Sequence, residues 1–166
     1  MKRLNDDIMD FFKKQSFVIV TTLDSDGTPH DSCKDLIRLS RDGRIYLLDL
    51  YMRRTFENLK KDPHMCVAQV DEHRFAGYCL KGRGRVVKIE RLRAQVTKIW
   101  QKKMNSRIVN RIIRNIHDDK GHPAQPESLL PRPEYMIVMD VDDIIDLTPG
   151  HIKGYGAQKQ GGRHGQ

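Results

Sequence analysis

No apolar run in this chain of 166 residues approaches the roughly 18 to 20 residues that a membrane-spanning helix needs. The opening stretch MKRLNDDIMDFF carries acidic residues where a secretory signal peptide has an apolar core. A hydrophobic content of 38% nevertheless fits one compact domain with a modest core. We therefore expect a cytoplasmic protein with no membrane partner, with one domain over residues 1–150 and a flexible tail over residues 151–166.

Cysteine and closely spaced metal ligands are also scarce. The three cysteines, Cys33, Cys66 and Cys79, are odd in number and each falls in a predicted strand, which argues against a disulfide framework. The chain has no Cys-x-x-Cys pair, and its histidines lack the spacing of metal ligands. His64 and Cys66 share a face of one strand, but two ligands do not make a site. We predict no metal.

The first third of the chain alternates apolar strands with tight turns. Residues 17–23 read FVIVTTL, an almost continuous apolar run that is typical of a strand covered on both sides. Asp24 to Gly27 then supplies turn residues, and a second turn follows at Arg41-Asp42-Gly43. Because the segments between and after these turns also read as strands, we predict an antiparallel meander of three strands over residues 17–50.

The rest of the chain adds strands and a few helices. A short helix is predicted after Arg53 and ends before Pro63. Strands are predicted over 64–71 and 77–89, and a last strand begins at Tyr135. Six strands with few helices predict a mostly β fold with added helices, namely a six-stranded antiparallel barrel, since closure removes exposed sheet edges.

Between the last two strands, at about residues 90–118, apolar residues recur at spacings of three and four. The pattern predicts a long amphipathic helix or a broken pair of helices. The other face is basic, with eight Lys or Arg and no Asp or Glu between Arg91 and Arg114. This face is either solvated or binds an anionic partner such as a nucleic acid.

Anion chemistry concentrates where the third strand runs into the short helix, at Arg53, Arg54 and Thr55. Free backbone N–H groups and the helix dipole favour an anion at a helix start, and arginine can grip phosphate oxygens with two hydrogen bonds. Thr55 adds a hydroxyl donor. The alternative is that both arginines only solvate the start of the helix.

The order of these pieces resembles the pyridoxamine 5′-phosphate oxidase-like superfamily, whose members have an FMN-binding split barrel. The resemblance covers about residues 5–90, and the closing strand adds VDDII at 141–145. It rests on the following motifs in serial order: the strand 17–23, DG at 26–27 with PH at 29–30, DGRIY at 42–46, RT at 54–55 with NL at 58–59, DP at 62–63, and LKGRGRV at 80–86.

This resemblance implies a homodimer with FMN in two clefts at the interface. The positions that correspond to the flavin contacts are Ser32, Cys33, Lys34, Asp35, Leu48 and Asp49, and those that correspond to the phosphate contacts are Arg53, Arg54 and Thr55. A cation at Lys34 near the flavin would stabilise the reduced ring. Alternatively, Lys34 forms an ion pair with Asp35 or Asp49.

The leading hypothesis is an FMN-dependent oxidoreductase that acts on a small-molecule substrate or redox partner, with no catalytic residue assigned. The second is a flavin, deazaflavin or haem binding protein without turnover. The third is a nucleic-acid-binding module that uses the basic helix over 91–114. The family often has an apolar or aromatic residue where Lys34-Asp35 stand, and its vitamin-processing members have an amide donor near Gly77-Tyr78. These departures argue against pyridoxamine phosphate oxidation itself.

Overall fold

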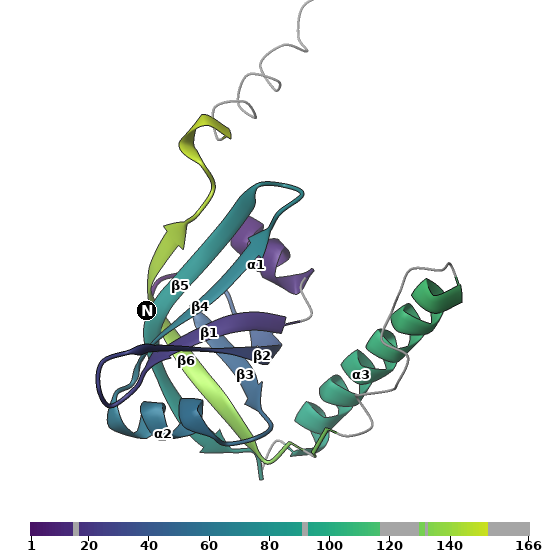
Figure 1. The fold of residues 1–166 in the computed structure, drawn as a ribbon, viewed down its shortest axis with the longest axis horizontal. Coiled ribbons are helices and arrows are strands. Elements are labelled where there is room, and N and C mark those ends of the chain that lie inside the picture. Colours follow the sequence, from purple (N-terminus) through teal and green to yellow (C-terminus); the bar gives the residue numbers. More distant parts are fainter. Residues whose placement is uncertain (15–16, 91–92, 117–129, 132, 153–166) are drawn as a thin grey trace, which may run out of the picture.

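Six antiparallel strands close into a barrel in the order β1-β2-β3-β6-β5-β4 (Figure 1). The computed structural model describes residues 1–14, 17–90, 93–116, 130–131 and 133–152. The barrel confirms the predicted mostly β architecture; most of the predicted tail, residues 153–166, lies outside the described residues. The strands are β1 (Phe17–Leu23), β2 (Pro29–Leu39), β3 (Arg44–Asp49), β4 (His64–Asp71), β5 (Ala76–Lys88) and β6 (Tyr135–Asp146).

Two short helices cover opposite ends of the barrel, as Figure 1 shows. Helix α1 (Asp6–Lys13) begins at Asn5, whose side chain accepts a hydrogen bond from the backbone N–H of Ile8, and it buries Phe12 completely against the core. Helix α2 (Arg54–Lys61) packs Leu59 into the same core from the other end. Burial of these apolar faces is what holds both helices on the barrel.

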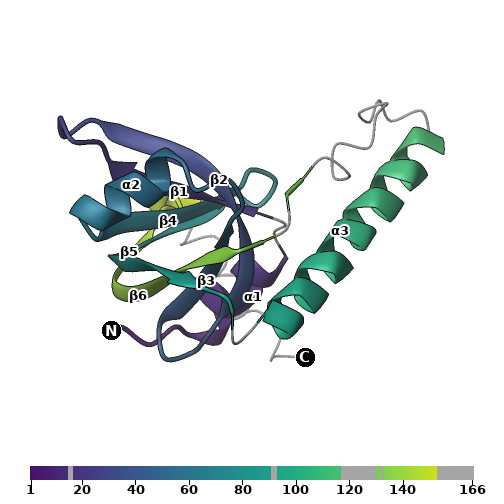
Figure 2. The same ribbon diagram turned by 90° about the horizontal axis from the view of Figure 1, so that it is seen from below.

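The long segment between β5 and β6 contains one continuous helix, α3 (Arg93–Ile116). Its N-terminal half packs on the outside of the barrel, where Val96 and Met104 are buried and Trp100 contacts a second apolar cluster around Leu48. Figures 1 and 2 show that the helix leans away from the barrel toward its C-terminal end. Apolar side chains there are therefore about half exposed, namely Val109, Ile112 and Ile113.

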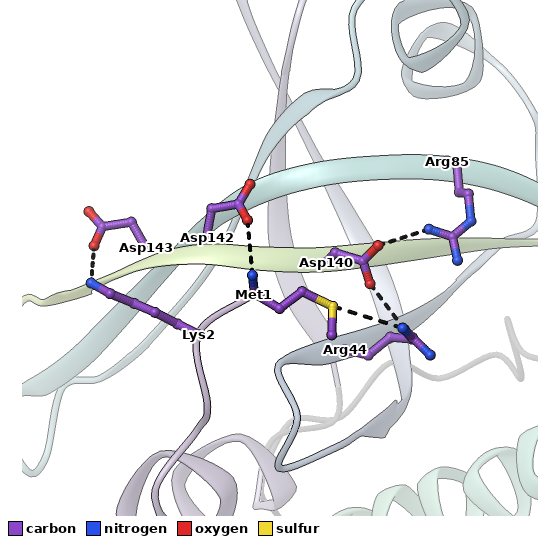
Figure 3. A network of polar contacts seen from close by, with 7 residues as sticks. All are labelled: Met1, Lys2, Arg44, Arg85, Asp140, Asp142 and Asp143. Atoms are coloured by element: carbon purple, nitrogen blue, oxygen red, sulfur yellow. Dashed lines mark hydrogen bonds and ion pairs between the residues drawn. The ribbon is translucent and has the colours of Figure 1, made fainter.

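Polar contacts tie the start of the chain and two neighbouring strands to β6 (Figure 3). Asp140 accepts hydrogen bonds from Arg44 on β3 and Arg85 on β5, both at 3.0 Å, and these two guanidinium groups hold the pKa of Asp140 below its usual range. Lys2 forms an ion pair with Asp143 at 2.6 Å. The same strand approaches β5 so closely that a Cβ on Gly82 would lie 2.0 Å from the backbone oxygen of Asp140.

The outer face of β1 and β4 is apolar and open. Phe17, Ile19 and Val70 are 45 to 58% exposed, and Cys33 lies opposite Ile19 on the neighbouring strand β2. The cysteines at positions 66 and 79 are half-buried on β4 and β5, whereas Cys33 is exposed, and all three are free thiols. Burial, and then the neighbouring thiol of Cys66, raises the pKa of Cys79 to about 11. No described helix is both long enough and apolar enough to cross a membrane.

Candidate functional site

Four polar side chains meet at the α2 end of the barrel, and we call them the mouth cluster: Ser32, Lys34, Asp49 and Thr55. The Ser32 and Thr55 hydroxyls lie 3.0 Å apart, and either can donate the hydrogen bond between them. Lys34 Nζ donates to Asp49 Oδ1 at 2.8 Å. Ser32 and Lys34 alternate along β2 and so share one face of it, while Asp49 ends β3 and Thr55 starts α2. The turn that joins β3 to α2 thus brings all four together.

The Lys34–Asp49 pair is buried, with side-chain exposures of 11% and 0%. Of the two alternatives for Lys34 as an ion-pair partner, the structure shows Asp49. The second oxygen, Asp49 Oδ2, is buried and has no hydrogen-bond partner within the described residues. A buried carboxylate oxygen without a donor is costly, so this atom is suited to accept a hydrogen bond from a bound group. A ribityl hydroxyl or a ring N–H of a flavin has the required chemistry.

The start of α2 offers donors to an anion. Arg53 occupies the N-cap position and its side chain makes no capping hydrogen bond, so the first backbone N–H groups of the helix are available. Met52, just before it, has a φ of 43° in the left-handed region, which turns the chain into the helix. Arg53 and Arg54 are exposed, whereas Thr55 is 2% exposed.

The two arginines make different contacts. The Arg53 guanidinium lies 5.7 Å from the centre of the Tyr51 ring, a cation–π arrangement. Arg54 forms an ion pair with Asp24 at 3.4 Å, which reaches over from the turn after β1. Neither guanidinium is sequestered, so both remain within reach of an anion at the helix start.

Asn58 was not assigned a role from sequence beyond its place in a motif, yet it fixes the helix that carries the site. It is 5% exposed, and its amide donates to Thr22 at 3.0 Å and to Asp24 at 2.8 Å. These bonds join α2 to the end of β1. An asparagine one turn after the Arg54-Thr55 pair was the signal available in the sequence.

Three of the residues predicted to contact a flavin lie on the side of the sheet that faces away from the mouth cluster. Asp35 pairs with Arg107 of α3, Leu48 packs in the apolar cluster under α3, and Cys33 is exposed on the outer face. The reason is the two-residue period of a strand, which sends neighbours to opposite faces. A flavin on the Ser32–Lys34 face can therefore reach Cys33, Asp35 and Leu48 only through their backbone.

The described part of the chain also has a cavity of about 360 Å³ on the outside of β1, β4 and β5. It lies at the same end of the barrel as α2, since it includes Leu23 at the end of β1 and His64 at the start of β4. Lys81 and Arg83 give it positive charge. Within the described residues, no group of three or more His, Cys, Asp or Glu is placed to hold a metal ion.

Comparisons with known proteins agree with the barrel fold. The sequence profile of pyridoxamine 5′-phosphate oxidase matches residues 4–132. No curated protein matches the sequence of the chain. Among solved structures, HupZ of Group A Streptococcus is similar with a TM-score of 0.63 and 18% identity, over 89% of this chain and 96% of that one.

Two further structures cover most of both chains. A putative pyridoxamine 5′-phosphate oxidase of Lactobacillus delbrueckii has a TM-score of 0.58 and 12% identity, over 87% of this chain and 95% of its own. A protein described as an F420 reductase has a TM-score of 0.54 and 12% identity, over 86% and 98%. At such identities these likenesses concern the fold.

Proposed function

Because this chain belongs to the pyridoxamine 5′-phosphate oxidase family, we propose that it is an FMN-dependent oxidoreductase that works as a homodimer. The observation that carries the proposal is the mouth cluster beside the open start of α2. It combines a phosphate-binding helix start with a buried carboxylate oxygen that lacks a donor. FMN is a molecule that supplies both a phosphate and hydrogen-bond donors.

The phosphate is held at the start of α2 in this proposal. The backbone N–H groups of the first turn and the positive end of the helix dipole face the anion, and Thr55 can donate its hydroxyl proton if Ser32 donates to it. Arg53 and Arg54 contact the phosphate from the exposed side. Three charge-assisted contacts of about 1.5 to 3 kcal/mol each would supply much of the roughly 8 kcal/mol that a micromolar complex requires.

The rest of the cofactor lies next to Lys34 and Asp49 at the α2 end of the barrel. Asp49 Oδ2 accepts a hydrogen bond from the cofactor, and the ion pair with Lys34 offsets the negative charge of that carboxylate, so that it repels an electron-rich ring less. A bound flavin supplies hydride or electron transfer, and the protein binds, orients and shields it. No side chain of the mouth cluster is assigned as an acid or base.

The open apolar face of β1 and β4 supports the homodimer. Phe17, Ile19, Val70 and Phe75 are 45 to 64% exposed, and exposed apolar side chains that gather on one surface often mark a protein–protein interface. A second copy on this face would bury these side chains.

The first experiment is a visible absorption spectrum of the purified protein after it is mixed with FMN and the excess is removed. Flavin bands that remain at about one per chain support the proposal. Anaerobic reduction by NADH or NADPH with repeated turnover then separates an enzyme from a flavin carrier. A protein that neither retains FMN nor quenches its fluorescence refutes the cofactor assignment.

A variant isolates the phosphate contact. We expect Arg54→Ala to weaken FMN binding about tenfold to a hundredfold, because one charge-assisted contact is lost. Riboflavin, which has no phosphate, should bind this variant nearly as well as it binds the unchanged protein. Arg41→Ala is the matched control, because Arg41 is equally exposed and pairs with Asp6 near α1, at the other end of the barrel. Equal losses for FMN and riboflavin would rule out the phosphate role.

A deazaflavin is the second candidate cofactor, supported by the fold shared with the F420 reductase structure. Parallel titrations with FMN and coenzyme F420 decide between the two. Haem is the third, and a Soret band in the same spectrum would reveal it.

A further inference from the structure

A second positively charged recess lies away from the mouth cluster, between α1, β2 and α3. It has a volume of about 530 Å³, in the range of small-molecule sites. The last turn of α1, the bulge of β2 at Ile37 and one face of α3 line it. We call it the α1–α3 cleft. Its lining residues are Lys13, Lys14, Ile37, Ile99, Lys102, Lys103, Ser106, Arg107 and Asn110.

Cations dominate this cleft. Five of the lining side chains are Lys or Arg, and within the described residues two carboxylates pair with them, Asp10 with Lys13 and Asp35 with Arg107. Lys103 donates instead to the backbone oxygen of Leu36, a neutral acceptor. Positive charge therefore exceeds negative charge in a concave site, where field lines are focused and anions are attracted.

The excess of positive charge is unfavourable for the buried ammonium group of Lys103. Burial lowers its pKa, and Arg107 lowers it as well, while Asp35 acts in the opposite direction. An anion in the cleft would offset the desolvation of this ammonium group. The charged form of Lys103 is thus stabilised when a negatively charged group enters the cleft.

The remaining lining residues narrow the class of ligand. Ile37 and Ile99 provide an apolar surface, and Ser106 and Asn110 provide hydrogen-bonding groups. Lys103 and Arg107 are one helical turn apart, roughly 6 Å along α3, which a chain of two or three phosphates can span. The recess is too small to hold a nucleic acid duplex.

The cleft is distinct from the proposed flavin site. Lys34 and Asp35 are consecutive on β2 and point to opposite faces, so that Lys34 contacts Asp49 in the mouth cluster and Asp35 contacts Arg107 in the cleft. We propose that the α1–α3 cleft is a second anion site, which binds a small molecule with an apolar ring and two or more phosphate groups, the chemistry of a nucleoside di- or triphosphate.

Calorimetric titration of the full chain at low ionic strength tests this site, with ATP, ADP, AMP and adenosine as probes. The affinity is expected to fall in that order and to weaken with added salt, because each lost phosphate removes charge. Added FMN should leave ATP binding unchanged. Absence of saturable binding at about 1 mM ATP, or displacement of ATP by FMN, overturns the proposal.

Variants locate the binding. Lys102 is exposed and lines the cleft, so Lys102→Ala should fold normally and weaken ATP about tenfold or more, while FMN retention stays the same. Lys98→Ala is the matched control, since Lys98 is an exposed lysine of the same helix outside the lining. Equal losses of ATP affinity in both variants would mean that the charge of the helix attracts ATP without a defined site, and would overturn the proposal. Binding of single-stranded RNA by a protein that does not bind ATP would also overturn it.

Discussion

The buried pair of Lys34 and Asp49 makes a quantitative prediction about stability. Lys34→Met keeps the long unbranched side chain but removes its charge, which leaves the carboxylate of Asp49 buried without its cation. Removing one partner of a buried ion pair typically costs about 3 to 5 kcal/mol, because the remaining charge is no longer compensated. With side-chain exposures of 11% and 0%, this pair belongs to that class.

The assay is urea unfolding of the cofactor-free protein at a fixed concentration, because a bound ligand or partner would add stability of its own. A loss of about 3 to 5 kcal/mol corresponds to a melting temperature lower by roughly 6 to 20 °C in a chain of this length. The double variant Lys34→Met with Asp49→Asn should recover part of the loss, because it removes the uncompensated charge.

Lys13→Met is the matched control. Lys13 also contacts an aspartate at 2.9 Å, but the exposures in that pair are 63% and 65%, so its loss should change the stability very little. If Lys34→Met destabilises the protein no more than Lys13→Met does, the argument from burial is wrong.

Two further predictions concern β5 and β6. Gly82→Ala should destabilise the fold by more than about 2 kcal/mol, because its Cβ would collide with the backbone oxygen of Asp140. The control Gly27→Ala should cost about 1 kcal/mol, because Gly27 has open space around it but a φ of +84°. Similar unfolding midpoints for the two variants would contradict this prediction. Asp140→Asn should be less stable than the unchanged protein at pH 7, and this difference in the free energy of unfolding should shrink as the pH falls below about 4. The reason is that a carboxylate with a lowered pKa contributes stability above its unfolded pKa and loses that contribution when it is protonated. A gap that is constant between pH 7 and pH 3 in urea unfolding would show that Arg44 and Arg85 do not act through its charge.

The barrel was predictable because its signals are local. Turn residues at Asp24 to Gly27 and at Arg41 to Gly43 separate apolar runs, and each run became a strand of the predicted sheet. The helix start at Arg53 was likewise visible from the change of period. These patterns depend on residues a few positions apart, which the sequence displays directly.

Contacts between distant segments were harder to predict. The sequence left Lys34 with two possible acidic partners, and only the pairing of β2 with β3 selects Asp49. The apolar face of α3 was recognised, but its spacing says nothing of the lean that leaves Val109 and Ile112 exposed. The α1–α3 cleft combines Lys13 with Lys102, far apart in the chain, so no sequence pattern could reveal it.

The position of Cys33 gives this protein a native attachment point for a spectroscopic label. Cys33 is exposed among the apolar residues of the outer face, whereas Cys66 and Cys79 are half-buried and the raised pKa of Cys79 keeps it a neutral thiol at physiological pH. A thiol-reactive fluorophore or spin label should therefore attach first at Cys33. Its emission colour or its distance to a second label would then report, without any engineered residue, whether two chains meet on this surface.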